Sequence, residues 1–415
     1  MSSHTKAWAG VFVTAALVVA ARSSWAIPAY GRQFNEKCTT CHTPQPPRLN
    51  NVGLTFQRLG YRFLDTDDNG KLTYRAREQH NVGEDLSFLI DLKLSDSSAD
   101  PWTIDLHEVE IMGSGSAGTN NEFAYFAEYV LAEDDKGAAL EDARVQYAHG
   151  DPAGVFTVRA GQFIPMLWRK ANTGRLTTSR PLFVDTRAPR LTGAGGSRSM
   201  VRLRERHQGI EFGYALNKVK DGAMSNTFFA GTVSKGLLNG RTEEGSDTEN
   251  SKDLALQVMH LYGDRNTVSA FYWDGKDGAG DAGGTKFTQD ITRLALVGNH
   301  VIAKNADVLY GYLDGSDDVN LAGVPTLDSK SHFLELDYTF REATEDTGPL
   351  TAVLRYDRFR QDNYNFATAT AATATTKALT VGLAGQESDN LLWSLEYHKI
   401  QDGDRLLTAE LKLVY

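Results

Sequence analysis

The chain has 415 residues, a formal net charge of −10, 41% hydrophobic residues and only two cysteines. The negative charge argues against a general nucleic-acid-binding protein, so we expect no nucleic-acid partner. After the N-terminal apolar run, no stretch of about 20 apolar residues occurs, which excludes a membrane-spanning helix.

The first 26 residues have the layout of a secretory signal peptide. Lys6 precedes an apolar run over residues 7–21, and the sequence SWA at residues 24–26 places small residues at the two positions that a signal peptidase inspects. The apolar run is too short for a transmembrane helix. We therefore predict a signal peptide over residues 1–26 and an exported mature chain that begins at Ile27.

Both cysteines lie in one motif. Cys38 and Cys41 are separated by two residues, and His42 follows directly, which is the C-x-x-C-H pattern of c-type haem attachment. Cysteines three apart lie on one side of a helical turn, where they can form thioethers with the two vinyl groups of a haem. A disulfide closing so small a loop would add little stability, and a zinc site would need more Cys or His nearby. A thioredoxin-like redox pair would need βαβ surroundings. The motif predicts one covalently bound haem c, with His42 as proximal ligand of the iron, and no catalytic side chain.

Short helices are predicted on both sides of the motif. A helical turn over residues 30–36 precedes it, and Asn50 is a suitable N-cap for a second helix. Gly60 is placed to end that second helix. Its expected apolar face, at near-helical spacing, consists of Leu49, Val52, Phe56 and Leu59.

The distal ligand of the iron has few candidates. Between residues 43 and 84 there is no methionine, and His80 is the only histidine, so it is the distal candidate in this segment. His107 and Met112 are rivals further along the chain, and an open or water-filled position is a further alternative. Ligation by two histidines would give a lower potential than ligation by histidine and methionine.

From Leu86 onward, segments of about ten residues alternate polar and apolar side chains between clusters of Gly, Asp, Asn and Ser. Short turns at residues 263–265 and 303–305 alternate with longer loops over 235–251, 275–284, 314–330 and 361–375, which is typical of outer-membrane barrels. The 16 candidate strands begin near Leu86, Trp102, Glu122, Ala139, Gly154, Gln208, Asn226, Lys252, Asn266, Thr285, Ala306, Ser331, Gly348, Thr376, Asn390 and Arg405.

The end of the chain favours a membrane barrel over a soluble β-domain. Tyr415 is the last residue, and apolar side chains precede it at alternate positions from Leu407 to Leu413. We therefore predict a mainly β fold. A transmembrane antiparallel β-barrel of about 16 strands occupies residues 86–415, embedded in outer-membrane lipid, and a small α-helical haem segment over residues 27–85 forms its plug.

One connection, over residues 163–207, is long and strongly basic. It carries nine arginines and one lysine, against only Asp185 and Glu205. Folded inward, it would narrow the lumen and favour anions by Coulomb attraction. It would equally serve to neutralise haem propionates or to hold an acidic part of the plug. The alternative is a solvated external loop.

Residues 29–63 read AYGRQFNEKCTTCHTPQPPRLNNVGLTFQRLGYRF. Together with the predicted signal peptide and barrel, this segment resembles the fused outer-membrane monohaem cytochrome c–porins of iron-oxidising bacteria. The resemblance is at the level of the motif here and of the architecture in the barrel. It implies a haem plug in the barrel mouth or lumen, in the outer membrane of a Gram-negative bacterium.

The same resemblance implies the function. Electrons would pass from extracellular Fe(II) or another donor to a periplasmic c-type cytochrome or another soluble carrier, with iron(II) oxidase activity when Fe(II) is the donor. The competing interpretation is an anion-selective porin with an accessory or sensory haem, which the basic connection favours. A periplasmic electron carrier with a soluble β-domain is a third, and the terminal strand pattern argues against it.

Overall fold

The computed structural model describes residues 29–75, 85–98, 101–117, 122–133, 138–165, 168, 174–186, 190–192, 198–199, 203–204, 206–220, 223–237, 252–282, 285–344, 348–388, 390–401, 403 and 405–414. The predicted signal peptide, His80 and Tyr415 lie outside these residues. In this part of the chain, no helix combines the length and the hydrophobicity needed to cross a bilayer.

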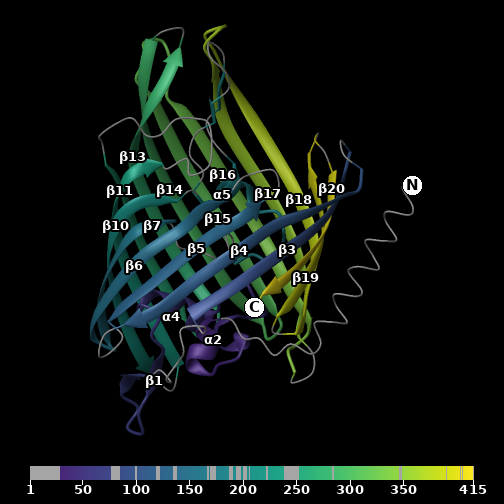
Figure 1. Ribbon diagram of the computed structural model, residues 1–415. Coiled ribbons are helices and arrows are strands. Elements are labelled where there is room, and N and C mark those ends of the chain that lie inside the picture. The colour runs from purple at the N-terminus through teal and green to yellow at the C-terminus, as the bar shows by residue number, and fades with distance from the viewer. Residues whose placement is uncertain are drawn as a thin grey trace.

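The chain forms a closed antiparallel barrel of 16 strands (Figure 1). The sheet closes where the last strand pairs with the first, for example Leu413 with Ile90. The strands are β3 (Leu86–Ser97), β4 (Thr103–Ala117), β5 (Phe123–Glu133), β6 (Ala139–Asp151), β7 (Gly154–Phe163), β10 (His207–Lys220), β11 (Ala223–Leu237), β12 (Asp253–Tyr262), β13 (Asn266–Ala282), β14 (Thr285–Ala303), β15 (Ala306–Val319), β16 (Leu327–Arg341), β17 (Leu350–Asn365), β18 (Thr370–Ser388), β19 (Leu391–Ile400) and β20 (Arg405–Val414). The predicted fold is therefore confirmed.

Several long loops were predicted wrongly, because the strands continue into them. The structure extends β13 to Ala282 and starts β14 at Thr285, so most of the expected loop over residues 275–284 is paired strand. Likewise β17 and β18 continue through the expected loop over residues 361–375. Beyond the bilayer a strand needs no apolar face, so the alternation that marks it in the sequence fades. These extensions make the tall hairpins at one end of the barrel (Figure 1).

Side chains alternate between an apolar exterior and a mostly polar interior. On β16, Leu334, Leu336 and Tyr338 are exposed, whereas Glu335 and Asp337 are buried. On β12, Leu254, Leu256 and Val258 are likewise exposed beside buried polar neighbours. An apolar outer band with a polar lumen is the arrangement of a barrel embedded in lipid.

The N-terminal segment lies at the barrel end that carries the short turns (Figure 1). It comprises α2 (Ala29–Phe34), α3 (Cys38–Cys41), α4 (Asn51–Arg58) and a hairpin of β1 (Leu64–Thr66) with β2 (Leu72–Tyr74). We call residues 29–75 the plug segment.

The predicted ends of the second plug helix are confirmed in detail. The Asn50 side chain accepts a hydrogen bond from the Gly53 amide, which caps α4. Gly60 follows the helix with a φ of 70°, a backbone conformation that favours glycine. The predicted apolar face was wrong at Val52, which is exposed, because Leu54 takes its place against the barrel wall.

The part of the long basic connection that the structure describes folds into the barrel rather than outward. Its described part includes α5 (Leu182–Asp185), β8 (Arg190–Thr192) and β9 (Arg198–Ser199), and β8 pairs parallel with β17. We call residues 174–186 the inner segment. Phe183 stacks on Phe333 of β16, with ring centroids 5.3 Å apart. Apolar side chains therefore fill part of the lumen beside the inner segment.

Candidate functional site

The motif residues lie on one helical turn. Cys38 and Cys41 form the ends of α3, neither is in a disulfide, and the His42 amide donates to the Cys38 carbonyl at 2.9 Å. Thr40 donates its hydroxyl proton to Glu36 at 2.7 Å, which ties α3 to the residues before it. The arrangement presents two thiols and an imidazole from five consecutive residues.

Helix α4 holds the motif turn by close packing. A Cβ at Gly53 would lie 2.4 Å from the Cys41 carbonyl oxygen and 2.8 Å from a methyl carbon of Leu49. The Asn50 amide donates to the same Cys41 carbonyl at 2.8 Å. Because only glycine allows this approach, Gly53 is a site residue that the sequence motif by itself does not identify.

Burial determines the protonation of the motif side chains. The pKa of the Cys41 thiol is raised to about 12, chiefly by burial, with smaller upward contributions from Glu36 and Cys38 and a downward one from Arg75. Burial also lowers the pKa of His42 to about 4, although the backbone of Arg48 and of Pro47 favours the protonated ring. At neutral pH the structure therefore presents a protonated thiol and a neutral imidazole, and only a neutral imidazole can bind a metal.

An aromatic cluster packs beside the motif. It contains Phe34, Phe56, Tyr61 and Phe63, with Tyr30 and Cys41 against it. The Phe56 and Phe63 rings lie 4.3 Å apart, and Tyr30 stacks on Tyr61 at 4.6 Å. This is the apolar wall that a porphyrin would need, and it is continuous with one of the two thiols.

Polar contacts dock the plug segment inside the barrel. Asn51 donates its side-chain amide to the carbonyls of Tyr262, Gly263 and Asn266 at the turn between β12 and β13. Arg58 pairs with Glu211 of β10 at 3.6 Å. These contacts join α4 to the barrel wall at the end with the short turns.

Two further residues of the plug segment also contact the wall. The Tyr61 hydroxyl accepts a hydrogen bond from Arg144 of β6 at 2.8 Å. Arg48, whose side chain is 1% exposed, pairs with Glu335 at 2.8 Å and with Asp337, both on β16. The plug segment is therefore bound to the wall at several separate points, and each depends on residues distant in the sequence.

The residues fit a covalently attached haem. Two cysteines that are not in a disulfide lie three residues apart on a helical turn, a neutral histidine follows, and aromatic side chains line one side. The buried Nδ1 of His42 makes no hydrogen bond within the described residues. Among those residues, no group of three or more His, Cys, Asp or Glu side chains is placed to hold a metal ion by itself.

The structure describes two of the three candidates for the distal ligand, Met112 and His107. Met112 of β4 is two positions from Ser114, whose carbonyl accepts a hydrogen bond from Gln33 of the plug segment, so both residues lie on the same face of the strand. His107 lies near Asp91, which pairs with Lys412. His80, the candidate within the plug region, lies outside the described residues.

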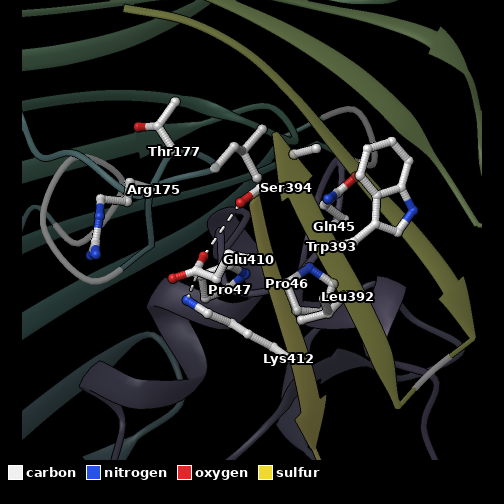
Figure 2. Close-up of a pocket in the computed structure, with 12 residues that line it drawn as sticks. Gln45, Pro46, Pro47, Arg175, Thr177, Leu392, Trp393, Ser394, Glu410 and Lys412 are labelled. Carbon is white, nitrogen blue, oxygen red and sulfur yellow. Dashed lines mark hydrogen bonds and ion pairs between the residues drawn. The ribbon is translucent and has the colours of Figure 1, made fainter. Parts of the chain in front are cut away.

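A small cavity of about 40 Å³ joins the plug segment, the inner segment and the wall (Figure 2). The loop after the motif contributes residues 45–47, and the inner segment contributes Arg175 and Thr177. On the wall, Glu410 accepts from Ser394 at 3.4 Å and pairs with Lys412 at 3.1 Å. The basic connection therefore reaches the immediate neighbourhood of the motif.

The inner segment is held by a second buried arginine. Arg355 of β17 donates to the hydroxyls of Thr177 and Ser179 and pairs with Glu335 and Asp357. The same Glu335 binds Arg48 of the plug segment. One carboxylate of the wall thus connects both inserted parts of the chain.

The fold and its surfaces define a porin-like barrel of the outer-membrane class, with chain packed inside its lumen. This confirms the predicted localisation in the outer membrane of a Gram-negative bacterium.

Comparison with solved structures finds similar barrels. The trimeric form of OmpT, an outer membrane protein of Vibrio cholerae, shares 13% identity over 80% of this chain and 98% of its own, with a TM-score of 0.52. An anion-selective porin from Comamonas acidovorans shares 10% identity over the same fractions, with a TM-score of 0.52. Salmonella typhi OmpF in complex with daunomycin shares 12% identity over 80% and 97%, with a TM-score of 0.51. At these identities the likeness concerns the fold alone. No protein-family model and no curated protein sequence matches the chain.

Proposed function

We propose that this protein is an outer-membrane cytochrome–porin that carries electrons between an extracellular donor, Fe(II), and a periplasmic c-type cytochrome. Residues 1–26 are the signal peptide, residues 27–85 are the haem segment and residues 86–415 are the barrel. The observation that supports this most is the motif turn at Cys38–His42, packed by Gly53 and docked inside the barrel.

The residues of the plug segment have distinct roles in this proposal. Cys38 and Cys41 form the thioethers, and His42 is the proximal ligand. When bound, the haem supplies a one-electron redox centre. The aromatic cluster around Phe56 excludes water from one side of the site. Met112, His107 and His80 are the candidates for the distal ligand.

The position of the plug suits a soluble partner. Lys37 and Thr39 of the motif turn are exposed at the barrel end that carries the short turns, which is the periplasmic end in this class. A single haem there does not span a hydrocarbon core of about 30 Å. The periplasmic carrier therefore docks at the plug, and the donor reaches the haem from the lumen side.

A second function, an anion-selective porin with an accessory haem, is favoured by the arginines of the basic connection. Arg175 and Arg180 are partly buried and lie near each other and near Arg204. However, Arg204 pairs with Asp185 at 2.6 Å, and Arg175 lies near Glu396 and Glu410. The docked plug and the apolar filling beside the inner segment also favour electron transfer over an open pore.

Electron flux across a vesicle membrane separates the two functions. The purified protein is reconstituted in liposomes that enclose an electron acceptor, and Fe(II) is added outside. We expect reduction of the acceptor by wild type and none by Cys38→Ala. Anion conductance without electron flux in the wild type would overturn the proposal.

A matched control tests whether the loss follows from the haem. Ser98→Ala changes the exposed residue that follows β3 and keeps the motif, so it is expected to retain wild-type flux. Detergent-extracted Cys38→Ala must still migrate as a folded barrel for its loss of flux to count.

A further inference from the structure

Arg48 lies between the motif histidine and the charged wall of the barrel. Its carbonyl accepts a hydrogen bond from the Thr43 amide at 3.2 Å, and the neighbouring Leu49 forms a backbone bridge with His42. Its guanidinium points the other way, to Glu335 and Asp337 on β16. One residue therefore touches the backbone of the proximal ligand's loop and two carboxylates of the lumen.

The charges around Arg48 do not balance. Arg48 and Arg355 face Glu335, Asp337 and Asp357, so two cations meet three carboxylates. All five side chains are almost fully buried. Buried charges interact more strongly than exposed ones because the surroundings screen them less. The junction therefore places a net negative charge beside the loop that carries His42.

We infer that Arg48 is the positioning residue that couples His42 to the barrel wall, and that Glu335 and Asp337 thereby set the potential of the haem. This inference rests on the proposed function. Ferric haem carries one positive charge more than ferrous haem, so a net negative junction stabilises the ferric form and lowers the potential. Loss of a wall carboxylate raises the potential, and loss of Arg48 lowers it.

The test is a redox titration of the purified protein, followed by the haem spectrum. Arg48→Gln is expected to shift the potential downward and Glu335→Gln upward, with the spectrum of the wild type retained. Glu211→Gln is the matched control. It removes the same charge from another buried carboxylate of the wall, which pairs with Arg58 of the plug segment and with Arg159 of β7, and is expected to shift the potential less. Asp337→Asn replaces Glu335→Gln if that variant fails to fold.

The sign of the shifts separates tuning from structural loosening. Looser packing around the ligand would move both variants in the same direction and alter the spectrum, which would overturn the inference. Unchanged potentials in both variants would overturn the inference as well. If the wild type carries covalent haem in that case, the proposed function is not contradicted. A wild type without covalent haem would overturn both.

Discussion

Asn51 is the residue whose loss should most clearly release the plug segment from the barrel. Its side chain is buried, and its amide nitrogen lies 2.8 to 3.2 Å from three carbonyl oxygens at the β12–β13 turn. Its amide oxygen accepts a hydrogen bond from Thr267 at 3.2 Å. Since the nitrogen carries two protons, we count two donated bonds and one accepted bond.

Replacement of Asn51 by Ala removes these three bonds. At roughly 0.5–1.5 kcal/mol each, the docking of α4 weakens by about 3 kcal/mol. That is about a 100-fold rise in the population of the undocked state, because about 1.4 kcal/mol corresponds to tenfold. The assay is amide hydrogen exchange of α4 in lipid nanodiscs, where exchange by local opening follows this population.

Val52→Ala is the control for this prediction. Val52 adjoins Asn51 on the same helix, but its side chain is 44% exposed and has no hydrogen-bonding group. We expect exchange in this variant within about twofold of wild type, as for most surface substitutions. Unchanged α4 exchange in a folded Asn51→Ala variant would refute the view that this turn anchors the plug.

Three further predictions test the motif, the wall and the exterior. Gly53→Ala should reduce the haem bound per chain, because the added Cβ would meet the Cys41 carbonyl. The haem content is measured by absorbance of the denatured protein. The control Gly113→Ala, whose Cβ has no neighbour nearer than 3.8 Å, should bind haem normally. Arg355→Met should destabilise the inner segment by about 3–5 kcal/mol, because it leaves buried carboxylates unpaired. The expected result is faster proteolysis within residues 174–186, and an unchanged cleavage rate would count against the role of Arg355. Leu334→Arg on the outer face should destabilise the barrel by about 2–4 kcal/mol in urea titrations with lipid vesicles. Phe340→Arg near the rim should destabilise it by only about 0–1 kcal/mol. Equal destabilisation by the two variants would contradict the assigned membrane position.

The barrel was predictable from the sequence because its determinants are local. Alternation of apolar and polar residues depends only on the pleat of each strand, so strands such as β16 were located from their own residues. The start of β18 was predicted at Thr376 and lies at Thr370, since its first residues stand outside the apolar band. The cysteine spacing is equally local, which is why the motif was visible without a structure.

The docking of the plug was not predictable, because it depends on pairs far apart in the chain. Arg48 and Glu335 are separated by 287 positions, and nothing near Arg48 in the sequence indicates its partner. The alternating pattern of β16 places Glu335 on the polar face of the strand, but this pattern does not indicate which residue it binds. The inward fold of the basic connection was one alternative of several, and contacts such as Leu182 with Asp357 decide it.

The central claim is that the plug segment carries one covalent haem within the barrel. The intact mass of the denatured chain, expressed in a host that attaches c-type haem, tests this most directly. The account predicts one haem per mature chain in the wild type and none in a Cys38→Ala, Cys41→Ala double variant. A folded wild-type barrel from such a host that carries no covalent haem would contradict it.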